Sequence, residues 1–270
     1  MSPGAGPPPD VVAALRTAGC VFAEDEAVLL VAAAHDAAQL TALVARRVGG
    51  EPLEQVLGWA EFAGLRVRVE PGVFVPRRRT EALVEAALGL LPPTPSGTCA
   101  AGPPRPVVVD LCCGTGAIGA AVAAARDVEL HACDVDPAAV RCARRNLAGV
   151  GTVHAGDLYA ALPEALQGGV TLLLVNAPYV PTAAIRDMPR EARQHEPPVA
   201  LDGGTDGLDL HRRVAADAAR WLAPGGHLLL ETSRPQTPAT AAAVRAAGLD
   251  VRTASDDERD ATVVVGRRRA

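Results

Sequence analysis

The chain has 270 residues and a formal net charge of −5, and all 26 of its basic residues are arginine. A net acidic chain lacks the basic footprint of nucleic-acid-binding domains, so no direct nucleic-acid binding is expected. No apolar segment approaches the ~20 residues that a membrane helix needs, and the N-terminus lacks a signal-peptide pattern. These features predict a cytoplasmic protein without membrane contact. The six cysteines lack metal-ligand spacing, so no metal site is predicted.

Residues 1–58 are predicted to form a helical domain. Asp10 is expected to cap a helix that runs through Ala18 and stops at Gly19. Two amphipathic helices are expected at 24–35 and 36–48, the second capped by Asp36, and residues 51–58 are expected to add one or two turns.

Residues 59–79 are predicted to form a β-hairpin connector, because apolar and polar residues alternate around Pro71-Gly72. A helix is expected at about 80–91. The Pro- and Gly-rich stretch 92–106 has the composition of an exposed linker inside a larger domain, residues 80–270.

Short apolar strands then alternate with helices. This order predicts an α/β fold with a mostly parallel sheet covered on both faces. The last two strands are too close in sequence for a crossover helix, so they should pair antiparallel at the sheet edge. The predicted strands are 107–111, 129–134, 152–155, 170–175, 227–231, 250–254 and 262–265, and the predicted helices are 115–126, 137–148, 208–222 and 236–247.

Four successive strands end in short polar residues, namely Asp110, Asp134, Asp157 and Asn176. Any one of them is more often a turn or cap residue than a ligand contact. Because ligands of open α/β sheets bind outside the carboxyl ends of the strands, four such residues together favour a ligand crevice.

The loop "DLCCGTGAIG" follows the first of these strands. Gly114, Gly116 and Gly119 match the dinucleotide fingerprint, which alone is a weak signal. Asp110 argues against a nicotinamide cofactor, since its carboxylate would repel a pyrophosphate but would suit an ammonium group.

S-adenosylmethionine fits these positions better. Asp110 would face its amino-acid moiety, Asp134 its ribose hydroxyls and Asp157 its adenine amine, with Leu158 packed on the ring. The predicted cofactor-binding residues are Asp110, Cys112, Cys113, Gly114, Thr115, Gly116, Asp134, Asp157, Leu158 and Asn176.

Three segments resemble the HemK/PrmC family of protein-glutamine methyltransferases: "NAPY" at 176–179, the glycine loop, and "EPPVALDGGTDGLDLHRR" at 196–213. The resemblance implies a Rossmann-like class I S-adenosylmethionine-dependent methyltransferase domain behind a helical substrate-recognition domain. It also implies methylation of the glutamine in the Gly-Gly-Gln loop of a peptide chain release factor, with S-adenosylhomocysteine as the product.

The resemblance makes Asn176, Ala177, Pro178 and Tyr179 the catalytic segment. The Asn176 side-chain oxygen and the Ala177 carbonyl would each accept one N–H of the substrate amide. Pro178 would fix the chain direction, and Tyr179 would pack against the amide.

Residues around this segment have alternative roles. Phe74 either packs on the substrate's methylenes or is a core aromatic of the hairpin. Residues 180–207 are expected to cover the site, with Glu196 structural. His195 and His211 are expected on a surface loop and helix rather than as bases, and Arg77 either orients the connector or is a solvated cation.

The chain departs from the family pattern at four positions. Cys112 replaces a glycine, which is tolerable if its φ stays negative. Ala177 replaces a proline, and Arg78 and Arg79 replace a proline and an acid. A different amino or amide acceptor therefore stays open: another protein, a small molecule, or adenine in nucleic acid. So do a nucleotide-dependent oxidoreductase and a non-catalytic binding protein.

Overall fold

The computed structural model describes residues 6–93 and 104–270. The linker predicted at 92–106 therefore lies mostly outside the described residues. No helix in the described part of the chain is both long enough and apolar enough to cross a bilayer.

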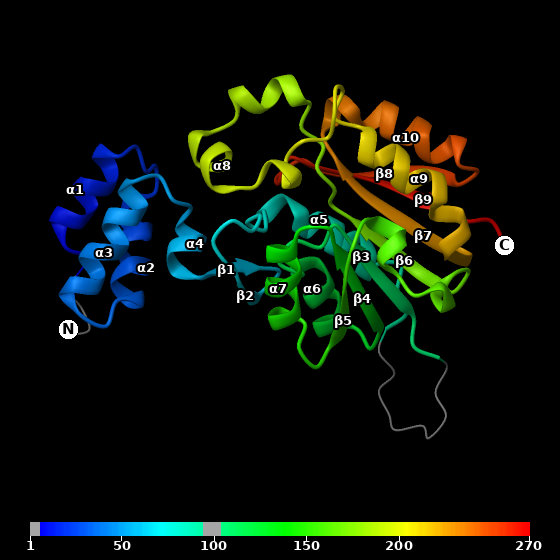
Figure 1. The fold of residues 1–270 in the computed structure, drawn as a ribbon, viewed down its shortest axis with the longest axis horizontal. Helices are drawn as coiled ribbons and strands as arrows, with labels where there is room; N and C mark the ends of the chain where they lie inside the picture. The colour runs from blue at the N-terminus through cyan, green and yellow to red at the C-terminus, as the bar shows by residue number, and fades with distance from the viewer. Residues whose placement is uncertain (1–5, 94–103) are drawn as a thin grey trace.

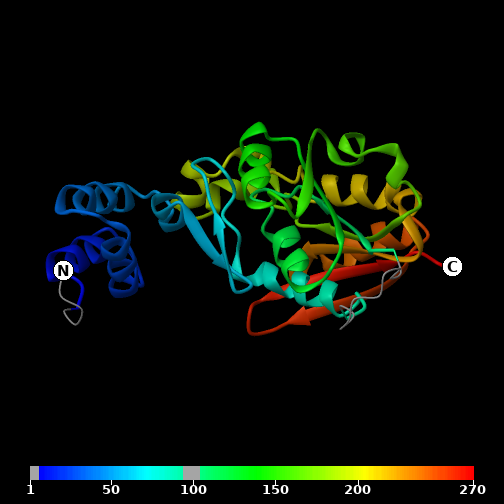
Figure 2. The ribbon, with the colours of Figure 1, turned by 90° about the horizontal axis from the view of Figure 1, so that it is seen from below.

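Four helices open the chain: α1 (Pro9–Thr17), α2 (Ala23–Ala33), α3 (Ala37–Val48) and α4 (Leu53–Leu57). They bury a small core of their own that includes Leu15, Leu30, Leu43 and Val56. Figure 2 shows α1 to α3 at one end of the molecule, with α4 between them and the sheet.

The two predicted caps of these helices have different outcomes. Asp36 caps α3, since its carboxylate accepts a hydrogen bond from the Gln39 amide at 2.7 Å. The prediction for Asp10 was wrong, because Pro8 takes the cap position and Asp10 lies in the first turn. There its charge faces the positive end of the helix dipole, which stabilises the helix without a cap hydrogen bond.

The connector contains a two-stranded hairpin, β1 (Trp59–Phe62) and β2 (Leu65–Arg68). Its turn lies at Ala63-Gly64, where φ is +48° and +77°. Pro71-Gly72 also forms a turn, in which the Val73 amide donates to the Glu70 carbonyl at 3.1 Å, but this turn follows the hairpin, so the prediction that the hairpin reverses at Pro71-Gly72 was wrong. Two successive positive φ values make the tight turn that matches strand twist. Ala63 is an unusual residue at such a position, so the alternating pattern revealed the hairpin but not its turn.

A seven-stranded sheet forms the larger domain. Its order is β5-β4-β3-β6-β7-β9-β8, with β9 antiparallel to both of its neighbours and the other pairs parallel. The α/β fold and the antiparallel edge pair were thus predicted correctly. The strands are β3 (Val107–Leu111), β4 (Glu129–Asp134), β5 (Gly151–Ala155), β6 (Val170–Val175), β7 (Leu222–Thr232), β8 (Asp250–Asp256) and β9 (Ala261–Arg267).

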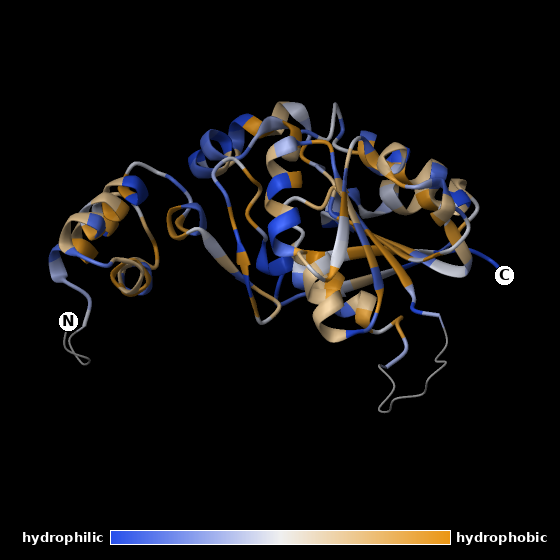
Figure 3. Ribbon diagram, turned by 60° about the horizontal axis from the view of Figure 1, so that its bottom comes forward, coloured by the Kyte–Doolittle hydropathy of each residue, from blue (hydrophilic) through white to orange (hydrophobic). Residues whose placement is uncertain are grey.

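Helices cover both faces of this sheet (Figure 1). Successive strand residues point to opposite faces, so Leu172 and Leu174 join one core whereas Leu173 and Val175 join the other. Figure 3 shows these central strands as the most hydrophobic part of the ribbon. The helices are α5 (Glu81–Leu88), α6 (Ala117–Ala125), α7 (Pro137–Asn146), α9 (Asp209–Trp221) and α10 (Thr237–Ala246).

The segment between β6 and α9, residues 180–207, forms an arch over the carboxyl ends of the strands (Figure 1). It consists of short elements: η4 (Thr182–Asp187), α8 (Arg190–His195) and η5 (Pro198–Ala200). The Gln55 amide of α4 donates to the Val73 carbonyl at 3.1 Å and to the His195 carbonyl at 3.4 Å. The helical domain, the connector and the arch therefore meet at one place.

Candidate functional site

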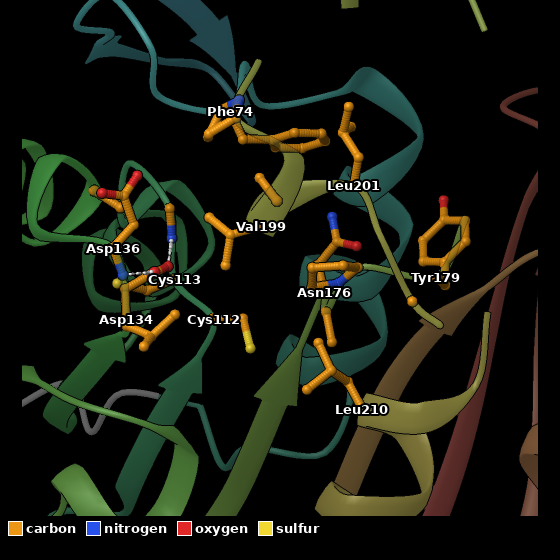
Figure 4. A pocket seen from close by; sticks show the side chains of 18 of the residues that line it. Phe74, Cys112, Cys113, Asp134, Asp136, Asn176, Tyr179, Val199, Leu201 and Leu210 are labelled. Carbon is orange, nitrogen blue, oxygen red and sulfur yellow. Dashed lines mark hydrogen bonds between the residues drawn. The ribbon is translucent and has the colours of Figure 1, made fainter. Parts of the chain in front are cut away.

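A cavity of about 730 Å³ lies at the carboxyl ends of β3, β4 and β6, under the arch. Small-molecule sites typically fall between about 300 and 1,000 Å³. One wall, the glycine-loop side, comes from residues 112–118 and 133–139. The opposite wall, the Asn176 side, comes from residues 74–80 and 176–180. Figure 4 shows Asp134 and Cys113 on the first wall and Asn176 and Tyr179 on the second.

The glycine loop is held by the Asp134 carboxylate. Its Oδ2 accepts a hydrogen bond from the Gly114 amide at 2.8 Å, and its Oδ1 accepts one from the Asp136 amide at 2.9 Å. Gly114 and Gly116 have φ of +55° and +77°, a conformation that favours glycine. Asp134 therefore lines the cavity and also ties the loops after β3 and β4 together, while each oxygen keeps a lone pair for a ligand.

Asp110 does not reach the cavity, contrary to expectation. It is fully buried beneath the loop, where its Oδ2 accepts the Gly119 amide of α6 at 3.0 Å and its Oδ1 has no partner among the described residues. Burial raises the pKa of Asp110 to about 7. A methyl at Gly119 would lie 3.2 Å from that carboxylate and from Leu130, so this glycine is needed for close packing.

Cys112 has φ of +56°, so the negative φ that was the condition for tolerating a cysteine at this position is not met. It follows β3 directly, at the start of the turn that contains Gly114. Burial raises the pKa of the Cys112 and Cys113 thiols. Both thiols are therefore protonated and poor nucleophiles at neutral pH.

Asp157 and Leu158 also line the cavity. The exposed Asp157 carboxylate forms an ion pair with Arg213 of α9 at 2.6 Å. A ligand amine would have to share this carboxylate with Arg213. Leu158 is buried, has φ of +48° and lines the cavity.

Asn176 directly follows β6 and lines the cavity. Its Nδ2 donates to the Thr80 hydroxyl at 3.2 Å, which leaves Oδ1 without a donor among the described residues. In the same described part of the chain, no donor bonds the carbonyl oxygen of the buried Ala177. Two acceptor oxygens on adjacent residues that line the cavity thus have no hydrogen bond within the described part of the chain.

The Tyr179 hydroxyl donates to Glu231 at the end of β7 (3.3 Å), and the Arg79 guanidinium lies over the Tyr179 ring with its carbon 5.7 Å from the ring centre. Burial raises the pKa of Tyr179 well above its usual value. The tyrosine is therefore a neutral wall of the cavity rather than a base.

Phe74 lies above Asn176 on the same side of the cavity in Figure 4 and is only half-buried, which fits a ligand contact better than a core aromatic. The Arg77 guanidinium carbon lies 5.1 Å from its ring centre. Arg77 also pairs with Glu196 of the arch, whose Oε1 accepts the Val75 amide at 3.3 Å. Arg77 is therefore no solvated cation: with Glu196 it joins the connector to the arch.

The surface placement expected for His211 was wrong. It is fully buried in α9, and its Nδ1 lies 3.0 Å from the Thr240 hydroxyl. Burial lowers its pKa to about 4, so it is neutral and packed in the core. His195 ends α8 and is half-buried, and neither histidine lines the cavity.

Several lining residues were missed by the sequence analysis. Val135 follows Asp134 and is 54% exposed at the cavity, a position where a valine needs an apolar partner. Its place directly after a polar strand end was the available signal. Thr80 and Met188 gave no signal, because their approach depends on long-range packing.

Comparison with known proteins identifies the family. Residues 90–195 match the family model "Methyltransferase small domain". A methyltransferase of 4-amino-L-phenylalanine and 4-methylamino-L-phenylalanine from Streptomyces pristinaespiralis is 41% identical, over 76% of this chain and 69% of that protein. The release factor glutamine methyltransferase of Streptomyces coelicolor is 39% identical, over 72% of this chain and 67% of that protein. The chain belongs to the release factor glutamine methyltransferase family.

A solved structure supports the fold of this methyltransferase. A methyltransferase from Pyrococcus furiosus superposes with a TM-score of 0.53 at 14% identity, covering 77% of this chain and 90% of that one. Family membership decides against the oxidoreductase interpretation of the glycine loop. The chain is a methyltransferase of the S-adenosylmethionine-dependent class, and its glycine loop belongs to that fold.

Proposed function

We propose that this methyltransferase moves a methyl group from S-adenosylmethionine to the side-chain amide nitrogen of a glutamine in the Gly-Gly-Gln loop of a peptide chain release factor. The observation that carries the proposal is a pair of acceptor oxygens without a hydrogen bond among the described residues. They are Asn176 Oδ1 and the Ala177 carbonyl, directly after the carboxyl end of β6. The proposed products are the methylated glutamine and S-adenosylhomocysteine, and the reaction needs no metal.

The glycine-loop side fits the cofactor. Gly114 lines the cavity without a side chain that would block a ligand, Asp134 offers carboxylate lone pairs to hydroxyl groups, and Val135 offers an exposed apolar face to a flat ring. Gly116 does not line the cavity: a methyl there would lie 3.1 Å from Leu147, so this glycine serves packing against α7. S-adenosylmethionine supplies an electrophilic methyl group when bound. We assign the cofactor to Asp134, Val135 and the loop 112–116, with Asp157 and Leu158 at the far end.

The Asn176 side performs the positioning. An amide nitrogen is a weak nucleophile because its lone pair is delocalised. Two oxygens that each accept one N–H hold the nitrogen in a single orientation and favour the positive charge that grows on it during the reaction. Tyr179 and Phe74 provide flat surfaces for the planar group and its methylenes.

The helical domain, residues 1–58, is proposed to recognise the substrate, with residues 59–79 as connector and 80–270 as the methyltransferase domain. A second hollow of about 490 Å³ supports this role. It adjoins the main cavity and is lined by Pro52 beside α4, by Arg77 and Arg79, and by Met188 and Glu191 of the arch. A protein loop that delivered a glutamine to Asn176 could pass through this hollow.

A small aromatic amino acid is the second candidate acceptor. Arg79, where the family has an acid, lines both hollows with its side chain 45% exposed, so a cation is available to a carboxylate near the acceptor. The relative from Streptomyces pristinaespiralis is named for such substrates.

Mass spectrometry after incubation with S-adenosylmethionine tests both candidates. We expect one methyl on the loop glutamine of the release factor, and none on a release factor whose loop glutamine is replaced by alanine. Methylation of 4-amino-L-phenylalanine without methylation of the release factor would instead establish the second candidate. Modification of neither would overturn both.

A further inference from the structure

Arg79 is a cation that lines both the main cavity and the second hollow, and its side chain is 45% exposed. Within the described residues its guanidinium makes two contacts. Its Nε lies 3.3 Å from Glu231 Oε1, and its carbon lies 5.7 Å from the centre of the Tyr179 ring. Neither contact uses the N–H groups of the two terminal nitrogens, so these groups can donate to a ligand.

The two contacts hold the Arg79 guanidinium from its buried side. Glu231 is 2% exposed and lines neither hollow, so the ion pair keeps Nε against the protein interior. The terminal nitrogens are thus left toward the hollows that Arg79 lines. Their N–H groups form a planar fork that matches the two oxygens of a carboxylate, a geometry that the point charge of a lysine lacks.

The other charged groups that line the second hollow have partners of their own. Glu196, whose side chain is fully buried, pairs with Arg77, and Glu191 lies 3.4 Å from Arg47 of α3. Arg79 differs from them, because its carboxylate partner lies outside the hollow. A ligand in this hollow therefore meets a cation whose terminal nitrogens no carboxylate of the lining engages.

The remote walls of the main cavity carry the opposite charge. Asp134 and Asp136 line the glycine-loop side, and Asp157 lines the far end of the cavity. A carboxylate on an acceptor is repelled by these groups and attracted by Arg79. An acceptor with a free carboxylate would therefore lie with that group at Arg79 and its other end toward Asn176.

The two candidate acceptors differ in this respect. A glutamine inside a protein loop has amide bonds on both sides and no carboxylate, so the Arg79 fork adds nothing to its binding. A free α-amino acid has a carboxylate, and an aromatic one would pack its ring against Phe74 and Tyr179, which line the cavity. The family has an acid where this chain has Arg79, and an acid at this position would repel a free carboxylate.

We propose that the terminal nitrogens of Arg79 bind the carboxylate of a free α-amino acid, so that amino acids with a side-chain amine or amide are acceptors for this site. The inference rests on the proposed role of Asn176, which would hold the nitrogen at the other end of the same molecule. The lone pair of that nitrogen forms the new C–N bond, and the sulfur of S-adenosylmethionine keeps the electron pair of the broken S–C bond. The nitrogen then releases one proton to water.

Pairs of probes that differ only in the carboxylate test this subsite. The probes are 4-amino-L-phenylalanine and L-glutamine, each compared with its α-carboxamide, in which a neutral amide replaces the carboxylate. With the wild type and S-adenosylmethionine, we expect the KM of at least one acid to be roughly 10- to 100-fold below that of its carboxamide, because the carboxamide loses a charge-assisted pair. Equal KM values within both pairs, or no methylation of any probe, would overturn the proposal.

Matched arginine variants assign this preference to one residue. Arg79→Gln should raise the KM of the acid roughly 10-fold or more, and leave kcat and the KM of the carboxamide within about 2-fold of wild type. Arg79→Lys should keep part of the preference, since it retains the charge but not the fork. Arg78→Gln is the control, because Arg78 is exposed and lines neither hollow, and it should keep the whole preference. A preference that survives Arg79→Gln, or that falls as far in Arg78→Gln, would refute the assignment.

A binding measurement separates this inference from the proposed function. Calorimetry on the enzyme saturated with S-adenosylhomocysteine needs no methyl transfer, and it should show the acid binding more tightly than its carboxamide in the wild type but not in Arg79→Gln. Equal affinity for S-adenosylhomocysteine in the two proteins would show that Arg79→Gln leaves the cofactor site intact. If the release factor is methylated and neither acid binds in an Arg79-dependent way, the inference fails and the proposed function stands. If an acid binds through Arg79 and is methylated while the release factor is not, the inference holds and the release factor is not the acceptor.

Discussion

The glycine-loop side and the Asn176 side of the cavity differ in how they are held in place. On the glycine-loop side, backbone amides of Gly114 and Asp136 bond one carboxylate, Asp134, and all three lie within 22 residues of chain. On the Asn176 side, side chains bond side chains: Asn176 contacts Thr80, 96 residues away, and Tyr179 contacts Glu231, 52 residues away. A local backbone frame suits a cofactor of fixed shape, whereas a network of side chains lets the acceptor specificity change by substitution.

Asn176→Ala is expected to have the largest effect of the variants that distinguish the two sides, and the effect should be on turnover. It removes one of the two acceptor oxygens, so turnover should fall ~10²–10³-fold, as for other preorganised polar groups. Calorimetry should show the affinity for S-adenosylhomocysteine unchanged, because the glycine-loop side is intact. Equal losses of turnover and cofactor affinity would show that the two sides are not separate.

Asp110→Asn tests the frame below the glycine loop. The folded protein holds a proton on Asp110 with a pKa of about 7, against an ordinary value of 3.8. The contribution of the protonated Asp110 to the free energy of unfolding is therefore fully present below about pH 4. It is lost as the pH rises through 7, on the order of 1 kcal/mol per pH unit. Asparagine keeps an oxygen for the Gly119 amide and carries no charge.

We therefore expect the free energy of unfolding of Asp110→Asn, measured in urea, to gain on the wild type as the pH rises from 4 to 8. Asp127→Asn, at an exposed carboxylate, is the control and should show no such gain. A constant difference across this range would contradict the buried, protonated Asp110.

Asp134→Ala should weaken the cofactor and leave the acceptor side in place. It frees the amides of Gly114 and Asp136, at a cost of about 1–3 kcal/mol. The dissociation constant for S-adenosylhomocysteine should rise roughly 10- to 100-fold. An unaltered dissociation constant would remove Asp134 from the cofactor site.

Cys112→Gly should have the smallest effect. Glycine relieves the positive φ of this position but loses more entropy on folding, so the free energy of unfolding should change by less than about 1 kcal/mol. Cys113→Gly, which empties a buried core position, should destabilise the protein more. A larger loss in Cys112→Gly, measured by urea unfolding, would mean that its thiol contributes to the packing of the loop.

Patterns of near neighbours predicted most of the fold and half of the site. The alternation of strands and helices gave the sheet and its antiparallel edge, and the strand-end residues Asp134, Asp157 and Asn176 were all brought to one cavity. These features can be predicted from the sequence because the two-residue period of a strand and the order of the strands determine where the strand-end residues lie. No contact with residues distant in the sequence is needed.

Tertiary packing decided the rest. It buried Asp110 and His211, gave Cys112 a positive φ, and moved the hairpin turn to Ala63-Gly64. It also brought Thr80 to Asn176 and Glu231 to Tyr179. These partners are tens of residues apart in the sequence. The sequence also does not show whether a polar side chain will be hydrogen-bonded to solvent or to a buried partner. Only the tertiary structure decides between solvent and a buried partner, because burial sets the free-energy cost of leaving a polar group without a hydrogen bond.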